Sequence, residues 1–129
     1  MIRRSRRITE MHQDLIQRIE LAHKTFSMIV TRLRNFARPV TIADVQFWIN
    51  FHTAERARLL ALRDVVGPHL QRLYPDTYDD AVEYVQDVPT LIGYMQQLVD
   101  SGNVTNARRT TLANAIEALM DGGADAIEG

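Results

Sequence analysis

The sequence contains no cysteine, which excludes disulfide bonds, zinc–thiolate centres and cysteine nucleophiles. It contains no run of roughly 18 apolar residues, so no membrane-spanning helix is expected. No apolar segment follows the arginines near the N-terminus, and secretion through a signal peptide is therefore not expected. Recognisable catalytic, metal-binding and nucleotide-binding motifs are also missing. The sequence accordingly predicts no enzyme activity, no metal site and no cofactor.

Lysine is nearly absent, because 14 of the 15 cationic residues are arginine. The net charge of −1 conceals a strong asymmetry along the chain. Residues 1–38 include nine basic and three acidic residues, a net charge of +6, whereas residues 76–129 include two basic and ten acidic residues, a net charge of −8. Opposite patches of this kind favour docking within one chain or between copies of it.

The segment from Thr9 to Phe36 has the most regular pattern in the chain. Its apolar side chains recur at intervals of three and four residues, as in an amphipathic helix, with Thr9 as the expected N-cap. The apolar positions are Ile8, Met11, Leu15, Ile19, Ala22, Phe26, Ile29, Leu33 and Phe36. A helix of this length spans about 42 Å, more than the roughly 36 Å diameter of a compact chain of this size. The pattern predicts an elongated bundle or a helix with one projecting end.

A second helix is expected over residues 42–66, after a break at Pro39 and before Gly67 and Pro68. Thr41 and Asp44 have the spacing of an N-terminal cap. This helix has two apolar sides, one formed by Ile42, Val45, Trp48 and Ile49 and the other by Phe47, Phe51, Ala54, Leu62 and Val65. A helix with two apolar sides is either central in a bundle or covered by a second molecule.

Shorter helices are expected over residues 76–87, 89–100 and 104–120, with boundaries at Pro89 and Gly102. The predicted fold class is all-α, a long antiparallel helical hairpin with two or three shorter C-terminal helices packed on it. The predicted parts are a basic arm at 1–8, a helical domain at 9–121 and an acidic tail at 122–129.

The candidate partner-binding residues belong to the basic arm, the start of the first helix, the aromatic group of the second helix and the acidic third segment. They are Arg3, Arg4, Arg6, Arg7, Met11, Leu15, Trp48, Asp76, Asp79, Asp80 and Glu83. The arginines suit either an acidic protein surface or nucleic-acid phosphates, and phosphate binding would weaken steeply with salt. The shorter helices are too short to cover the whole first helix, so a functional surface is expected along residues 1–20.

Two weaker patterns occur within the predicted helices. His52 and Glu55 are three residues apart and share a helix face, but a bundle metal site needs further carboxylates from other helices, so a hydrogen bond is the expected role. Residues 91–120 resemble a helix-turn-helix in outline, with Arg108 and Arg109 where base-reading side chains would lie. The acidic surroundings oppose DNA binding by this hairpin.

These features together predict a non-enzymatic structural or interaction protein that acts as a subunit of a larger assembly. A small virion component, such as a capsid cement or connector protein, is one subunit of this kind. The expected location is the cytoplasm or a virion. The expected partners are other proteins, including copies of this chain, and not a membrane. One alternative is a nucleic-acid-binding protein that uses the basic arm. Another is a small inhibitor that binds a host enzyme through its acidic segment.

Overall fold

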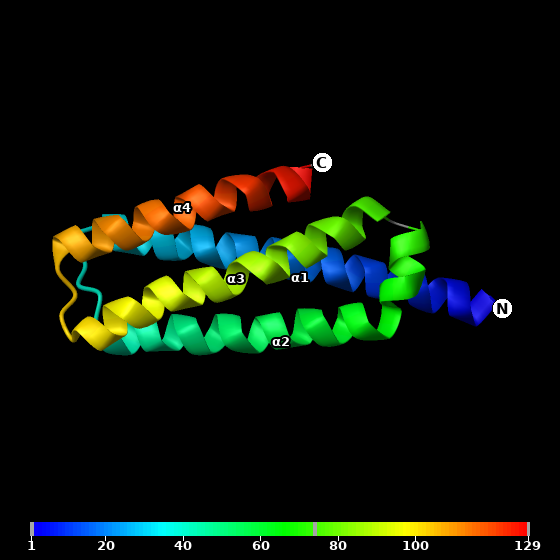
Figure 1. Ribbon diagram of the computed structural model, residues 1–129, viewed down its shortest axis with the longest axis horizontal. Helices are drawn as coiled ribbons and strands as arrows, with labels where there is room; N and C mark the ends of the chain where they lie inside the picture. Colours follow the sequence, from blue (N-terminus) through cyan, green and yellow to red (C-terminus); the bar gives the residue numbers. More distant parts are fainter. Residues whose placement is uncertain (1, 74, 129) are drawn as a thin grey trace.

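The computed structural model describes the backbone of residues 2–73 and 75–128. Side chains are described for residues 10–61, 68, 71–73, 75–76, 78–79, 82 and 85–119. The chain forms four helices, α1 (Ile2–Arg34), α2 (Ile42–Leu73), α3 (Pro75–Ser101) and α4 (Asn106–Glu128). The predicted all-α fold, with its long antiparallel pair of helices, is confirmed (Figure 1).

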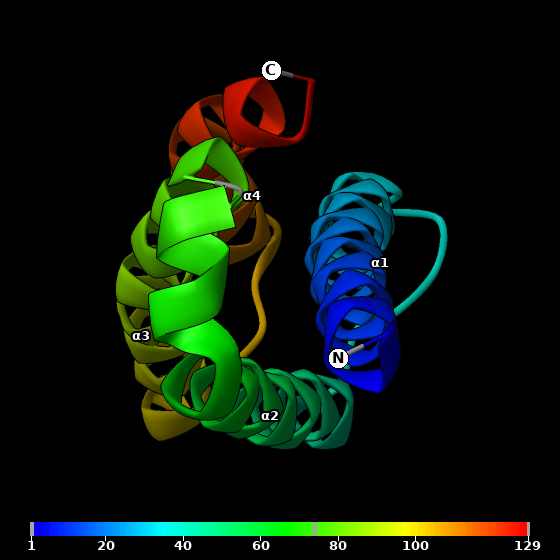
Figure 2. The ribbon, with the colours of Figure 1, turned by 90° about the vertical axis from the view of Figure 1, so that its right-hand side faces the viewer.

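Successive helices run in opposite directions, so the fold is an up-down-up-down four-helix bundle (Figure 1). Each helix packs against the next one in the chain, and α1 closes the bundle by packing against α4. Seen along the bundle, α2 and α4 occupy opposite corners (Figure 2). Each helix therefore has one side toward a shared core and one side toward solvent.

The predicted apolar stripe of α1 forms one wall of this core. Its six positions from Leu15 to Leu33 are almost fully buried, and Phe26 and Leu33 have no exposed surface. Buried side chains of the other helices complete the core, including Val45, Leu59, Val85, Leu91, Met95, Leu98, Leu112 and Ile116. The exception is Phe36, which follows the end of α1 and is 49% exposed. The helical period therefore identified the buried face of α1 correctly.

The start of α2 is capped as the sequence predicts. The Thr41 hydroxyl accepts a hydrogen bond from the Asp44 amide at 3.1 Å, and the Asp44 carboxylate accepts one from the Thr41 amide at 3.0 Å. This reciprocal pair satisfies two donors that a helix N-terminus otherwise leaves free. The predicted end of α2 at Gly67 and Pro68 is wrong, because the helix continues to Leu73 with Pro68 inside it. An interior proline removes one backbone hydrogen bond and bends a helix, and α2 changes direction in its last turns (Figure 1).

Two further predicted boundaries also disappear in the structure. Pro89 lies inside α3, so residues 75–101 form one helix where two were predicted. The last helix begins at Asn106 and passes through Gly122 and Gly123 to Glu128, where a helix ending at Met120 was predicted. Glycine makes a helix less favourable by about 1 kcal/mol but does not obstruct it. The predicted stop at Gly102 is confirmed by a left-handed φ of 70°.

The N-terminal segment does not form a separate arm. The first helix begins at Ile2, so Thr9 is inside it and the predicted cap at Thr9 is wrong. Arginine is a good helix former, and nothing between Ile2 and Thr9 interrupts a helix. The first turns of α1 extend past the connection between α2 and α3 (Figure 1). Both alternatives predicted from the length of this helix are therefore present, an elongated bundle and a projecting end.

Candidate protein-interaction surface

The outer side of α2 carries the most exposed large apolar side chain among the described residues, Phe47, at 66%. Five exposed neighbours continue a line along the same side of the helix, Ala43, Asn50, Ala54, Ala57 and Ala61. The intervals along this line are four, three, four, three and four residues, the spacing of a face that packs against another helix. We call these six residues the α2 outer face. Apart from Phe47 and Asn50, its residues are all alanines, so Phe47 is the only large side chain on this face.

Two charged residues flank the α2 outer face near its two ends. Asp44 lies at the N-terminal end, and its pKa is held below the usual value, first by the hydrogen bond from the Thr41 backbone and further by the nearby Arg32. Arg58 lies toward the other end with 61% of its side chain exposed. The face therefore has a negative end and a positive end at neutral pH.

The inner side of α2 is fixed by the core, which determines the direction of the outer face. Val45, Ile49 and Leu59 are buried, and Trp48 is partly buried against the same cluster. Trp48, predicted as a partner anchor, therefore contributes mainly to the core, while the neighbouring Phe47 projects to solvent. The two apolar sides of α2 predicted a central helix or one covered by a second molecule. Of the second predicted side, Phe47 and Ala54 are exposed and Phe51 is partly buried, and the side chains of Leu62 and Val65 lie outside the described residues.

A cluster of ion pairs forms around the buried carboxylate of Glu55, between α2 and α1. Glu55 is 3% exposed, and its two carboxylate oxygens accept hydrogen bonds from Arg18 at 3.1 Å and from Arg58 at 2.9 Å. Arg18 also pairs with Asp14, one turn earlier on α1. Charged groups removed from water need such partners, because an unpaired buried carboxylate is strongly unfavourable. The cluster therefore fixes the rotation of α2 against α1.

The Glu55 side chain allows a test of how much this cluster contributes. Glu55→Leu is expected to change the free energy of unfolding by less than about 1 kcal/mol, because an apolar side chain of similar volume replaces a desolvated ion. Glu55→Ala is expected to destabilise the fold by about 2 kcal/mol, because it leaves a cavity. Urea unfolding of both variants measures the difference. An equal loss in both would show that the ion pairs themselves stabilise the protein.

His52 lies next to this cluster and faces the core. Its ring is 1% exposed, stacks on Phe26 with 3.8 Å between ring centroids, and meets Phe51 edge-on at 5.2 Å. The Nε2 atom is buried and has no hydrogen-bond partner. Burial lowers the pKa of His52 from 6.5 to about 4. A neutral ring in an apolar stack suits a core residue, and the pairing of Glu55 with two arginines leaves no shared ligand for His52 and Glu55.

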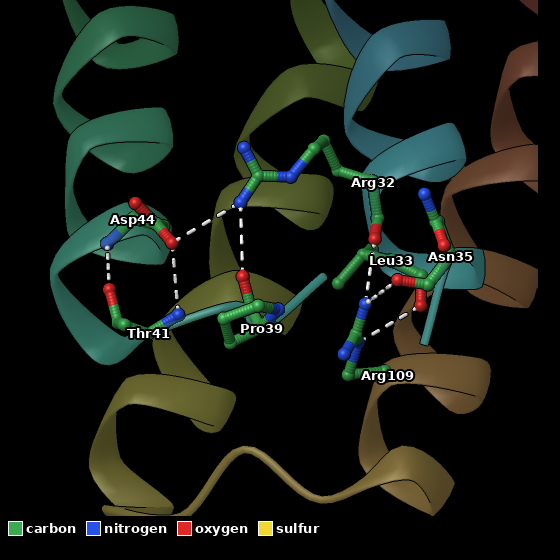
Figure 3. Close-up of polar contacts among 7 residues, drawn as sticks. All are labelled: Arg32, Leu33, Asn35, Pro39, Thr41, Asp44 and Arg109. Atoms are coloured by element: carbon green, nitrogen blue, oxygen red, sulfur yellow. Dashed lines mark hydrogen bonds and ion pairs between the residues drawn. The ribbon is translucent and has the colours of Figure 1, made fainter. Parts of the chain in front are cut away.

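Arg109, which is 3% exposed, holds the end of the bundle at which α1 terminates (Figure 3). Its guanidinium donates hydrogen bonds to three backbone carbonyls at the end of α1, those of Arg32 at 2.7 Å, Asn35 at 2.9 Å and Leu33 at 3.0 Å. The carbon atom of the guanidinium lies 5.2 Å from the Phe36 ring centroid. A helix C-terminus leaves carbonyls without partners and carries partial negative charge, and Arg109 satisfies both. The Arg109 side chain is therefore buried inside the bundle and does not lie at the surface, where a base-reading side chain would be needed.

A groove of about 370 Å³ lies between α3 and α4. Leu98 and Leu112 form its floor, and Tyr94 and Arg108 are among the residues around them. The Arg108 guanidinium donates to the Asn103 carbonyl at 2.9 Å. The volume is near the lower limit for small-molecule sites. Among the described residues that line the groove, Arg108 and Tyr94 are the only titratable ones, and none of these described residues is a carboxylate or a histidine.

The structure separates the other predicted site residues. Leu15 is buried in the core and is not part of a surface, whereas Met11 is partly buried against the core. Asp76 and Asp79 are exposed at the start of α3. The side chains of Arg3, Arg4, Arg6, Arg7, Asp80 and Glu83 lie outside the described residues. The arginine-rich start of α1 and the acidic start of α3 are at the same end of the bundle (Figure 1).

Comparison with known proteins gives no relative. No protein-family model matches this sequence, and neither a curated protein nor a solved structure is similar to it. Within the described part of the chain, no group of three or more histidine, aspartate or glutamate side chains is arranged to hold a metal ion. Searched over the same residues, no helix is long and apolar enough to span a membrane. The case for function therefore depends on the surface of this chain.

Proposed function

We propose that this protein is a non-enzymatic helical subunit that binds other proteins, and that the α2 outer face is its main contact surface. The observation that carries the proposal is the exposure of Phe47 on a face whose other residues, apart from Asn50, are all alanine. Burial of a phenylalanine side chain contributes about 1.5–3 kcal/mol, and a few residues usually provide most of the binding energy of an interface.

Two segments of opposite charge at one end of the bundle complement this surface. The arginine-rich start of α1 projects from the bundle, and the acidic start of α3 is at the same end (Figure 1). Exposed charges of this kind steer and orient partners more than they add affinity. We assign the binding energy to the α2 outer face and the orientation to these charges.

The test compares Phe47→Asp with Met28→Asp, each in a tagged chain captured gently from the cells that produce it. Met28 is a matched control because it is 61% exposed and lies on a different helix, α1. A partner protein, or a second copy with a different tag, is expected to bind the wild type and Met28→Asp but to bind Phe47→Asp at least about 30-fold more weakly. Equal binding by all three chains would remove the α2 outer face as the contact surface.

A second candidate function is nucleic-acid binding, favoured by one observation. Residues 2–8, with Arg3, Arg4, Arg6 and Arg7, belong to the projecting turns of α1 rather than to a separate arm (Figure 1). Four phosphate contacts give an affinity that falls steeply between low and moderate salt. Binding to a duplex that persists at moderate salt after removal of residues 1–8 would contradict this candidate.

A further inference from the structure

We propose that the α2 outer face binds a second copy of this chain, with the two α2 helices antiparallel and the two-fold axis passing near the level of His52. This inference depends on the proposed function, because it names the partner of the same face. It follows from three properties of the face, which are its symmetric spacing, the sizes of its side chains and the charges at its ends.

The spacing of the face is the same in both directions along the helix. Intervals of four, three, four, three and four residues are unchanged when the order is reversed. In an antiparallel pair, Ala43 therefore lies opposite Ala61 of the second copy, Phe47 opposite Ala57, and Asn50 opposite Ala54. A two-fold interface needs such self-complementarity, because the same patch is used on both copies.

The side-chain sizes fit this pairing. Each layer of the contact contains at least one alanine, and the only large side chain, Phe47, meets the small Ala57 of the second copy. Close packing of two helices requires such an alternation of large and small side chains across the contact. In a parallel pair, Phe47 would meet the same residue of the second copy, and the alanines would lie opposite alanines. Only the antiparallel arrangement gives each phenylalanine a small residue to cover.

The charges favour the same direction. Asp44 and Arg58 lie on the same flank of the face, 14 residues apart. In the antiparallel pair, Asp44 of each copy lies close to Arg58 of the other, which gives two opposite-charge contacts. In a parallel pair the two-fold axis runs along the helices, so the flank that carries Asp44 and Arg58 lies on opposite sides of the contact in the two copies and neither opposite-charge contact forms. The charge pattern therefore selects the antiparallel pair over the parallel one.

The size of the face predicts a weak and reversible dimer. A helix contact from Ala43 to Ala61 is about 28 Å long and, at a helix diameter of 10–12 Å, covers roughly 300 Å² per copy in projection. Stable complexes bury about 800 Å² per partner, so this contact belongs to the small, transient class. The dimer is expected to form as the protein concentration rises and to separate on dilution.

The first test is light scattering of the purified chain over a range of concentrations. The mass is expected to rise from the 14.8 kDa of one chain toward twice that value. Phe47→Asp is expected to remain at one chain mass at every concentration, and Met28→Asp is expected to behave like the wild type. Circular dichroism shows that each variant is still helical. A wild type that remains monomeric at the highest concentration would overturn the inference, and so would Phe47→Asp that dimerises like the wild type.

The second test determines the direction of the pair and uses the absence of cysteine. Ala43→Cys and Ala61→Cys are made as separate single variants and treated with a short thiol cross-linker. In the antiparallel dimer the two copies of residue 43 are about 27 Å apart, so neither variant alone is expected to cross-link, whereas a mixture of the two is. Cross-linking of Ala43→Cys with itself would show a parallel pair and overturn the inference.

The two proposals fail in different ways. If the purified chain remains monomeric but Phe47→Asp still loses a partner in cells, the α2 outer face binds a different protein. In that case the self-association is wrong and the proposed function stands. If Phe47→Asp changes nothing in either experiment, both proposals are wrong.

Discussion

Arg109→Met is expected to lower the free energy of unfolding by about 3–4 kcal/mol. The buried guanidinium donates to three backbone carbonyls at the end of α1 and lies beside Phe36. Hydrogen bonds from a charged donor contribute about 1.5–3 kcal/mol each to stability. Each carbonyl that is left buried without a donor destabilises the fold by about 1–3 kcal/mol more. Partial access of water to two of the three carbonyls, and the removal of a desolvated cation, reduce the sum. Methionine keeps the apolar stem of the side chain, so the loss measures the hydrogen bonds.

Urea unfolding followed by circular dichroism measures this effect. Arg108→Met is the matched control, because Arg108 is the neighbouring residue on α4 and is exposed. Its substitution is expected to cost less than about 1 kcal/mol, since exposed polar contacts contribute little. Arg109→Lys is expected to give an intermediate loss, because an ammonium group is a single point donor and not a planar fork. Equal losses for Arg108→Met and Arg109→Met would contradict the role assigned to Arg109.

Acidification from pH 7 to pH 4 is expected to destabilise the fold by about 3 kcal/mol through His52 alone. The pKa of His52 is about 4 in the folded chain and 6.5 when burial is lost, so the unfolded chain binds more protons between these values. Stability therefore rises with pH in this range. The contribution of His52 is complete above about pH 6.5 and is lost as the pH falls toward 4. A difference of about 2.5 pKa units at 1.36 kcal/mol each gives the expected magnitude.

His52→Leu isolates this effect, because leucine fills the site without titrating. The difference in unfolding free energy between the wild type and His52→Leu is expected to change by about 3 kcal/mol between pH 7 and pH 4. Carboxylates titrate in both proteins, so their contributions cancel in the difference. A difference independent of pH would show that the pKa of His52 is the same in the folded and the unfolded chain, and would contradict this prediction. At pH 7 the variant is expected to be at least as stable, since it removes the unpartnered Nε2 atom.

The sequence predicted those parts of the fold that depend on local patterns. The apolar stripe from Leu15 to Leu33 is the buried face of α1, the cap formed by Thr41 and Asp44 is present, and Gly102 ends α3. Each of these features is determined within a few residues of the chain. The boundaries at Pro68 and Pro89 were wrong because packing against neighbouring helices outweighs the local preference of a proline to end a helix.

The contacts that hold the bundle together could not be predicted from local patterns in the sequence. Arg18 reaches Glu55 across 37 residues, and Arg109 reaches the end of α1 across more than 70 residues. No interval in the sequence connects these partners. Trp48 and Phe47 are adjacent and both apolar, so only the rotation of α2 in the bundle shows that Phe47 is the exposed one. Of the second apolar side predicted for α2, Phe47 and Ala54 belong to the α2 outer face, whereas Phe51 is partly buried beside His52.

We expect this protein to contact other proteins through the α2 outer face. The most direct measurement is photo-cross-linking, with a photoreactive phenylalanine analogue at position 47 or position 28 in the cells that produce the chain. Protein adducts are expected from position 47 and few from position 28, although the two side chains are similarly exposed. Adducts whose mass is twice that of the chain would identify the second copy as the partner. Equal yields from the two positions, or no adduct from position 47, would contradict the claim.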